Sequence, residues 1–129
     1  MRPGNRFGSG APWENLYGYS RAVIAGPALF IAGTTATVDD EVVGVGDPYL
    51  QAMTAFGIAL DAVGKAGFDA EDVVRTRMFI TDMAHQAEIG RAHKELFDDI
   101  RPAATMVQVA GLAHPDHLIE VEIDAYLRH

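Results

Sequence analysis

The alternation of apolar and polar residues predicts five β-strands in this chain. In chain order, the predicted strands are 20–25, 28–32, 73–80, 104–110 and 118–127. Gly26-Pro27 separates the first two strands and is a turn signal, which indicates a hairpin. The last strand shows the pattern most clearly, because every second residue from Ile119 to Leu127 is apolar. A period of two places these residues on one sheet face and those between them on the other.

Two other segments repeat apolar residues at three- and four-residue steps, which is typical of helices with one buried side. Asp47-Pro48 predicts the start of the first helix and Gly67 its end. Its expected core stripe is Leu50, Met53, Phe56, Leu60 and Val63, beside a second face of small residues, Ala52, Ala55, Ala59 and Ala62. The second helix is predicted from about Met83 to Asp99, and Arg101-Pro102 ends it.

The order hairpin, helix, strand, helix, strand, strand predicts an α+β domain, with a mixed β-sheet backed by two α-helices. Residues 17–129 are expected to form this single domain. Residues 1–16 are expected to form an irregular N-terminal arm, with Trp13 and Leu16 available to pin its end to the body.

Both helices must cover the same apolar sheet face, so the opposite face is expected to be open in a monomer. Strand 73–80 is predicted to point Val74, Thr76, Met78 and Ile80 to the covered face and Arg75, Arg77 and Phe79 to the open face. A half-apolar, half-charged face is unusual for a free monomer, so we expect a symmetric homo-oligomer to bury it. The alternative is a solvated sheet face.

Composition excludes several kinds of chemistry. The 129-residue chain has a formal net charge of −8 and no cysteine. The negative charge disfavours nonspecific nucleic-acid binding, and the lack of thiols removes disulfides, thiol catalysis and zinc–thiolate sites. No apolar run approaches the roughly 20 residues of a membrane span, and no leader sequence is recognisable, so we expect a cytoplasmic protein. His114 and His117 lack the spacing of a zinc motif, and neither a metal nor a cofactor is predicted.

The carboxylates of the last strand are the first candidates for chemistry. Glu120, Glu122 and Asp124 are spaced at roughly 6–7 Å along one face. Like charges in a row raise each other's pKa values unless cations such as Arg75 and Arg77 intervene. A carboxylate with a raised pKa can act as a general base. For Glu122 and Asp124 cross-strand ion pairing is the favoured interpretation, whereas for Glu120 both interpretations stay open. His93 lies on the apolar side of the second helix and is predicted to be structural.

Three stretches of sequence carry a resemblance to a known family. They are Gly18-Tyr19-Ser20 with the strand that ends at Ile31-Ala32-Gly33; residues 72–77 with 79–82; and residues 101–107 with 119–122. With these motifs the chain resembles the RidA/YjgF family, often labelled endoribonuclease L-PSP. The resemblance implies a chorismate-mutase-like homotrimer with small-molecule pockets between subunits. It also implies hydrolysis of reactive enamines and imines to 2-keto acids and ammonia.

The resemblance assigns roles to several residues. Tyr19 matches the pocket tyrosine, Gly33 matches a glycine whose backbone contacts the ligand, and Glu120 matches the glutamate that positions the hydrolytic water. Thr105 and the main chain at Met106 are expected to line the same pocket. No cofactor is implied.

One position departs from the family pattern. Where the family has proline-alanine-arginine-serine, this chain reads Pro102-Ala103-Ala104-Thr105, so Ala104 replaces the arginine that clamps the substrate carboxylate. Losing such an anchor costs several kcal/mol. Arg21, Arg77 or Arg91 are candidates for a replacement cation; Arg91 stands beside Gly90, where the family has an asparagine.

Three functions are compatible with these residues. The first is a deaminase-type hydrolase with a substrate other than 2-imino acids. The second is a ligand-binding or regulatory trimer without turnover. The third, the ribonuclease of the family label, is disfavoured by the acidic charge and by the absence of a basic or aromatic stripe.

Overall fold

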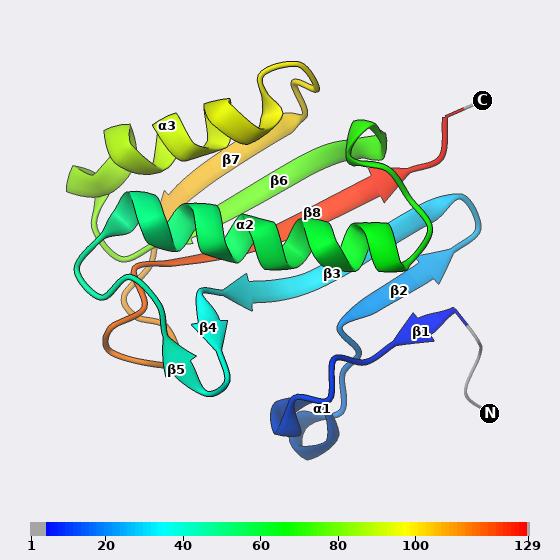
Figure 1. Cartoon of the computed structure of the whole chain (residues 1–129), viewed down its shortest axis with the longest axis horizontal. Helices are drawn as coiled ribbons and strands as arrows, with labels where there is room; N and C mark the ends of the chain where they lie inside the picture. The colour runs from blue at the N-terminus through cyan, green and yellow to red at the C-terminus, as the bar shows by residue number, and fades with distance from the viewer. Residues whose placement is uncertain (1–4, 129) are drawn as a thin grey trace.

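The computed structural model describes residues 5–128 and contains one six-stranded sheet with two long helices (Figure 1). The elements are β1 (Arg6–Phe7), α1 (Pro12–Tyr17), β2 (Ala22–Ala25), β3 (Ala28–Thr35), β4 (Thr37–Val38), β5 (Glu41–Val42), α2 (Pro48–Lys65), β6 (Val73–Ile80), α3 (Gln86–Phe97), β7 (Ala103–Gln108) and β8 (Ile119–Tyr126). Short 3-10 helices cover Ala70–Asp72 and Met83–His85. The second predicted helix therefore begins as a 3-10 turn before α3.

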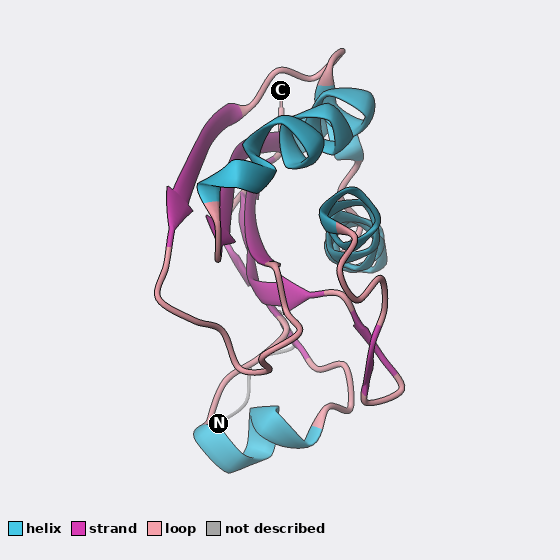
Figure 2. Cartoon of the chain, turned by 90° about the vertical axis from the view of Figure 1, so that its left-hand side faces the viewer, coloured by secondary structure: helices cyan, strands magenta, loops and turns pink. Residues whose placement is uncertain are grey.

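The sheet has the strand order β1-β2-β3-β8-β6-β7, and β4 and β5 form a separate two-stranded ribbon. Strands β6 and β7 are parallel, and the other neighbours in the sheet are antiparallel. Figure 2 shows α2 and α3 on the same side of the sheet, which leaves the opposite face without helical cover. The predicted α+β class, a mixed sheet backed by two helices, is confirmed.

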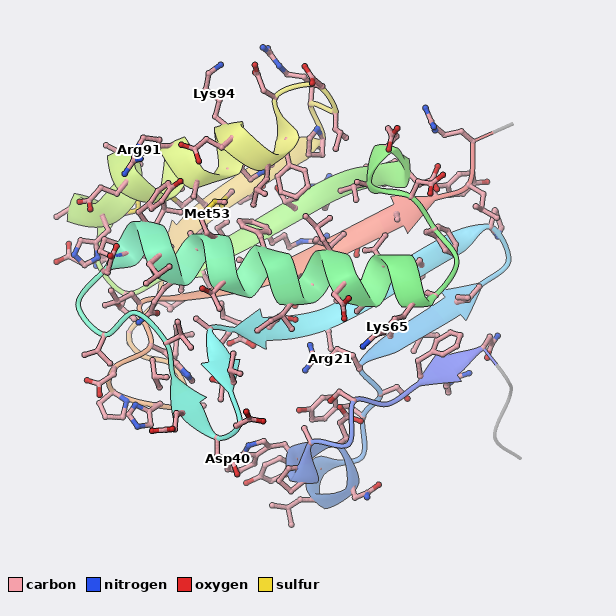
Figure 3. The ribbon with its side chains drawn as sticks, in the orientation of Figure 1. Arg21, Asp40, Met53, Lys65, Arg91 and Lys94 are labelled. Carbon is pink, nitrogen blue, oxygen red and sulfur yellow. The ribbon has the colours of Figure 1, made fainter. Side chains whose placement is uncertain are left out.

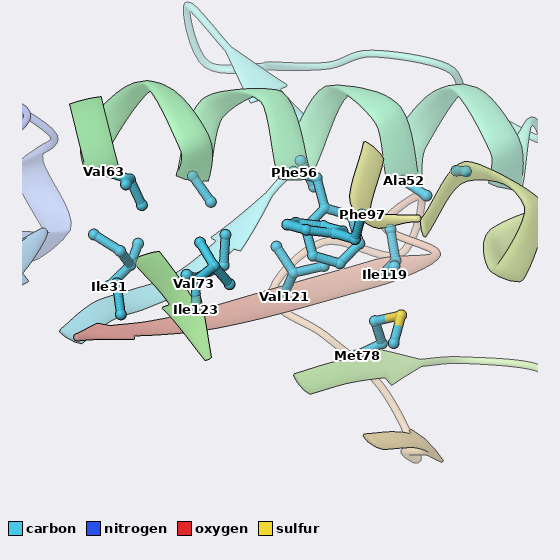
Figure 4. Close-up of a cluster of buried hydrophobic side chains, with 14 of the residues drawn as sticks. Ile31, Ala52, Phe56, Val63, Val73, Met78, Phe97, Ile119, Val121 and Ile123 are labelled. Atoms are coloured by element: carbon cyan, nitrogen blue, oxygen red, sulfur yellow. The ribbon is translucent and has the colours of Figure 1, made fainter. Parts of the chain in front are cut away.

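The core lies between α2, α3 and the covered sheet face (Figure 4). Ile119, Val121 and Ile123 of β8 have no exposed surface, and they meet the equally buried Phe56 of α2 and Phe97 of α3. The residues between them on β8 point to the open face, because successive side chains of a strand alternate. The face assignment predicted for β8 is therefore correct.

The core face of α2 differs from the predicted stripe. Leu50, expected in the core, is 42% exposed, whereas Ala52, Ala55 and Ala59 are fully buried. The alanines let the helix backbone approach β3 and β8 closely, so the small-residue face, with Phe56, makes the main contact. Leu50 therefore lies at the edge of the contact between α2 and the sheet.

In strand β6 the side-chain orientation predicted for one residue is wrong. Val74 was expected to share the covered face with Thr76, yet it is 48% exposed, and Val73 is buried instead. The pairing of β6 with β8 shifts register between Val73 and Arg75. Such a bulge inserts one extra residue and reverses the faces before it.

The N-terminal arm is not irregular where the structure describes it. Strand β1 pairs with β2, and α1 follows it. The arm is fixed by Glu14, whose buried carboxylate accepts hydrogen bonds from Ser9 N at 3.1 and 3.2 Å. Trp13 and Leu16 do not pin it, since they are 52% and 67% exposed. The part of this prediction that concerns residues 1–4 lies outside the described residues.

Within residues 5–128, no helix combines the length and the apolar character needed to cross a membrane.

Two histidines are built into the core. His93 Nε2 lies 2.8 Å from Thr76 Oγ1, and its ring packs 4.7 Å from that of Phe97, so the predicted structural role is confirmed. His117 is buried, with Nε2 2.8 Å from Thr37 Oγ1. Burial lowers the pKa of both rings.

We expect the free energy of unfolding to fall as the pH falls from neutral. The native state favours both neutral rings, so their contribution is complete above the unfolded pKa of about 6.5 and is lost as the pH falls through the lower native values. Urea denaturation of the wild type and of a His93→Gln/His117→Gln variant at about pH 7.5 and about pH 5.5 tests this. The variant should lose less stability over that range; an equal loss would contradict the assignment.

Candidate functional site

The open sheet face carries a ladder of charges from neighbouring strands. Arg77 of β6 stands opposite Glu122 of β8. Its Nη1 lies 3.1 Å from Asp124 Oδ2 and 3.6 Å from Glu122 Oε1. The cross-strand ion pairing predicted for Glu122 and Asp124 is confirmed. Arg77 is therefore a shared counter-ion of the sheet rather than a free cation.

Glu120 behaves differently from the other two carboxylates. Its direct neighbours across the strands are Phe79 on β6 and Thr35 on β3, which are both uncharged. Among the described residues it makes no ion pair. Burial raises the pKa of Glu120, the charge of Glu122 raises it further, and the positive charge of Arg21 lowers it in part. Glu120 is thus the carboxylate of this face that is suited to exchange a proton.

The Glu120 carboxylate packs directly against the backbone of Gly33. A Cβ placed on Gly33 would lie 2.1 Å from Glu120 Oε2, so only glycine leaves room for this contact. The pairing of β3 with β8 is irregular between Ile31 and Thr34, at the same place. The structure therefore brings together Gly33 and Glu120, two of the predicted site residues.

Arg21, the residue directly before β2, holds this irregular stretch. Its Nη1 donates to the carbonyl oxygens of Ala32 and Gly33, each at 3.1 Å, and to Thr34 Oγ1 at 2.6 Å. Thr34 is only 3% exposed. The sequence singled out Arg21 as a possible replacement cation but did not predict this bracing role, because the irregularity of β3 left no mark in the residue pattern.

Tyr19 lies beside the same stretch of β3. It is 39% exposed. Together with Phe30 and Ala32 it lines a hollow of about 400 Å³ in the single chain. Ala32 directly precedes Gly33 in the chain, although neither Gly33 nor Glu120 lines the hollow. An apolar group of a small molecule fits such a surface of aromatic and small side chains.

Strand β7 places the remaining predicted pocket residues at the sheet edge. Thr105 stands opposite Arg77, on the open face. Ala104 is opposite the buried Thr76, and Met106 packs against the core, so both side chains point to the helix side. Strand β6 separates β7 from β8. Within one chain, these residues are therefore not beside Glu120.

Arg91 is engaged on the helix layer. Its guanidinium lies 3.8 Å from the centre of the Tyr49 ring, and its Nη1 lies 3.8 Å from Glu95 Oε1. Tyr49 also donates a hydrogen bond to Glu95. Figure 3 shows Arg91 on α3 and Arg21 below β3. Within one chain, Arg91 is not a neighbour of Glu120, and its role in a pocket between subunits stays a prediction.

Metal-binding side chains are scattered in the part of the chain that the structure describes. No three histidine, aspartate or glutamate residues of residues 5–128 are grouped to hold an ion.

Comparisons with known proteins find relatives that align with nearly the whole chain. The family model described as Endoribonuclease L-PSP matches residues 11–127. An uncharacterized protein of Streptomyces coelicolor is 45% identical and is aligned over 94% of this chain and 90% of its own length. A RutC family protein of Pyrococcus horikoshii is 34% identical, over 84% of this chain and 86% of its own.

Solved structures share the fold. Rv2704 of Mycobacterium tuberculosis, described as a member of the YjgF/YER057c/UK114 family, superposes with a TM-score of 0.85 at 40% identity, over 95% of this chain and 98% of its own. TdcF of E. coli, solved with bound serine, gives a TM-score of 0.80 at 26% identity, over 99% and 98%. The match to nearly the whole chain by the family model and by these relatives shows that the protein belongs to the RidA/YjgF family, the family labelled Endoribonuclease L-PSP.

Proposed function

We propose that the protein hydrolyses small imines or enamines, with Glu120 as the general base. The observation that carries the proposal is a half-buried carboxylate with a raised pKa, without an ion-pair partner among the described residues, and seated on Gly33. Burial and the neighbouring Glu122 raise the pKa of this carboxylate, which makes it a stronger base than an exposed glutamate. Membership of the family supports the same reaction class.

The reaction needs one water molecule and no redox step. An enamine first tautomerises to the imine. Glu120 then removes a proton from water while the water oxygen bonds to the imine carbon, and the nitrogen takes a proton from solvent. The proton held by Glu120 next passes to the amino group of the resulting carbinolamine, which regenerates the carboxylate. The C–N bond breaks, ammonia leaves, and the hydroxyl group releases its proton to solvent as the carbonyl compound forms.

We propose an uncharged substrate rather than a 2-imino acid. Ala104 offers no charge, Arg77 is held by Glu122 and Asp124, and Arg91 lies on the helix layer. A substrate carboxylate would therefore meet the like charges of Glu120 and Glu122, which is unfavourable. Arg21 is already engaged, because its Nη1 donates to the carbonyls of Ala32 and Gly33 and to the Thr34 hydroxyl. The hollow beside Tyr19 would take the apolar part of the substrate.

We further propose that the working form is a homotrimer with its pockets between subunits. Phe30 and Val107 on the open face are 46% and 41% exposed, and a neighbouring subunit would cover them. This assembly would also bring Thr105 and the main chain at Met106 of one subunit toward Glu120 of the next. The cytoplasmic location expected from the sequence stays a prediction.

A ligand-binding trimer without turnover is the second candidate. It is favoured by the loss of the arginine at Ala104 and by the related TdcF structure, which holds bound serine. It would show ligand-dependent thermal stabilisation without product formation. A ribonuclease is disfavoured by the net charge of −8.

Glu120→Gln should lower turnover by at least about 100-fold, because it removes the base while keeping the shape of the side chain. The substrates are imines generated in situ by an amine oxidase, which are uncharged, and by an amino-acid oxidase, which carry a carboxylate. Ammonia release above the buffer rate is measured, and the uncharged imines should react faster. Glu122→Gln is the matched control and should retain most activity. Undiminished turnover in Glu120→Gln would remove Glu120 from the mechanism.

Gly33→Ala should lower turnover by about 10-fold or more while the fold persists. The added methyl group displaces the Glu120 carboxylate, which is the far end of a flexible side chain. Gly57→Ala on the exposed side of α2 is the control, since a Cβ there meets no atom within 4 Å. This control should leave turnover unchanged and raise the free energy of unfolding by about 0.5–1 kcal/mol. Full activity in folded Gly33→Ala would show that the contact is not needed.

Phe30→Glu should weaken the oligomer, because it places a charge on the face that the trimer would bury. Sedimentation equilibrium should give three times the mass of one chain for the wild type and a lower mass for the variant. Leu50→Glu serves as control, since Leu50 is similarly exposed, at 42%, on the helix layer. A wild-type mass of one chain would refute the trimer.

A further inference from the structure

We infer that Arg21 is the positioning residue of this site: its guanidinium braces the irregular stretch of β3 under Glu120 and places a fixed positive charge behind that carboxylate. The inference deepens the proposed function, since it rests on Glu120 as the reactive group. It concerns how the site is built and which charge controls it.

The bracing role follows from the hydrogen bonds of Arg21. Residues Ala32 and Gly33 lie where the pairing of β3 with β8 shifts register, so their carbonyls are outside the regular ladder. Arg21 Nη1 donates to both carbonyls and to the buried Thr34 hydroxyl. In addition, Ala32 N donates to the Arg21 carbonyl at 3.0 Å. Arg21 therefore holds this stretch with its main chain and its side chain together.

Because Gly33 contacts Glu120, the position of the Glu120 carboxylate depends on the position of the restrained Gly33 backbone. The Gly33 Cα faces Glu120 Oε2 so closely that no Cβ would fit between them. A shift of Gly33 away from Arg21 would therefore move the surface on which the carboxylate rests. A flexible glycine at an irregular strand position needs such a restraint to keep one conformation.

The charge role follows from the other groups that face Glu120. Glu122 on β8 is the like charge beside it, and β3 and β6 place the uncharged Thr35 and Phe79 directly opposite. Arg77 on β6 is neutralised by Glu122 and Asp124. Arg21 makes no ion pair among the described residues, and its positive charge lowers the pKa of Glu120 against burial and Glu122. Arg21 is therefore the cation that offsets part of the rise in the pKa of Glu120.

The test reads the protonation of Glu120 directly. The full chain is labelled with 13C-glutamate, and the side-chain carboxyl signal of Glu120, identified by its loss in Glu120→Gln, is titrated by NMR. Arg21→Gln keeps a hydrogen-bond donor but removes the charge, so the Glu120 midpoint should move to higher pH. Arg21→Lys keeps the charge and should stay near the wild type. Arg75→Gln removes a charge from the same sheet and is the matched control.

The inference is supported if Arg21→Gln shifts the midpoint more than Arg75→Gln, and it is overturned if the two shifts are equal. If Arg21→Gln fails to fold in a thermal melt, Thr34→Val replaces it. That variant removes the shortest bond to the guanidinium and should also raise the midpoint, and an unchanged midpoint overturns the inference. The titration needs no substrate. If the protein hydrolysed no imine, the proposed function would be refuted, whereas the effect of Arg21 on the Glu120 midpoint could still be measured.

Discussion

The two-residue period of β8, at the centre of the sheet, is the constraint on which the rest of the structure depends. Ile119, Val121 and Ile123 fill the space under α2 and α3, so Glu120 and its two neighbouring carboxylates must stand on the open face. A slip of one residue would bury three charges and expose the core. The packing of the hydrophobic core therefore also fixes the position of the candidate site.

Position, rather than residue type, distinguishes the three carboxylates of that face. Arg77 lies within reach of Glu122 and Asp124 and pairs with both. Glu120 precedes Glu122 by two residues on β8 and lies next to the irregular stretch of β3. Its cross-strand neighbours are Phe79 and Thr35. The same acidic pattern thus gives two carboxylates that pair with Arg77 and one, Glu120, without an ion-pair partner among the described residues.

The sequence predicts the elements whose pattern is local. The span of β6 and the start of α2, where Asp47 Oδ1 accepts from Leu50 N at 3.0 Å, agree with the structure. The exposure of Val74 could not be predicted, because a bulge is a property of a pair of strands. The role of Arg21 could not be predicted for a similar reason, since two of its hydrogen-bond acceptors are main-chain carbonyls of an irregular stretch.

The position of Ala104 gives a physical reason to look for the complete pocket between subunits. Ala104 is in register with the buried Thr76, so its side chain points to the helix side of the sheet, whereas Glu120 points to the open face. Strand β6 lies between their strands. A small molecule cannot contact both positions within one chain. In the proposed homotrimer it would do so where the exposed edge strand β7 of one copy meets the open face of another. Replacing an arginine by Ala104 would then change the charge of one wall of the pocket and leave Glu120, Gly33 and Arg21 on the other wall unaltered.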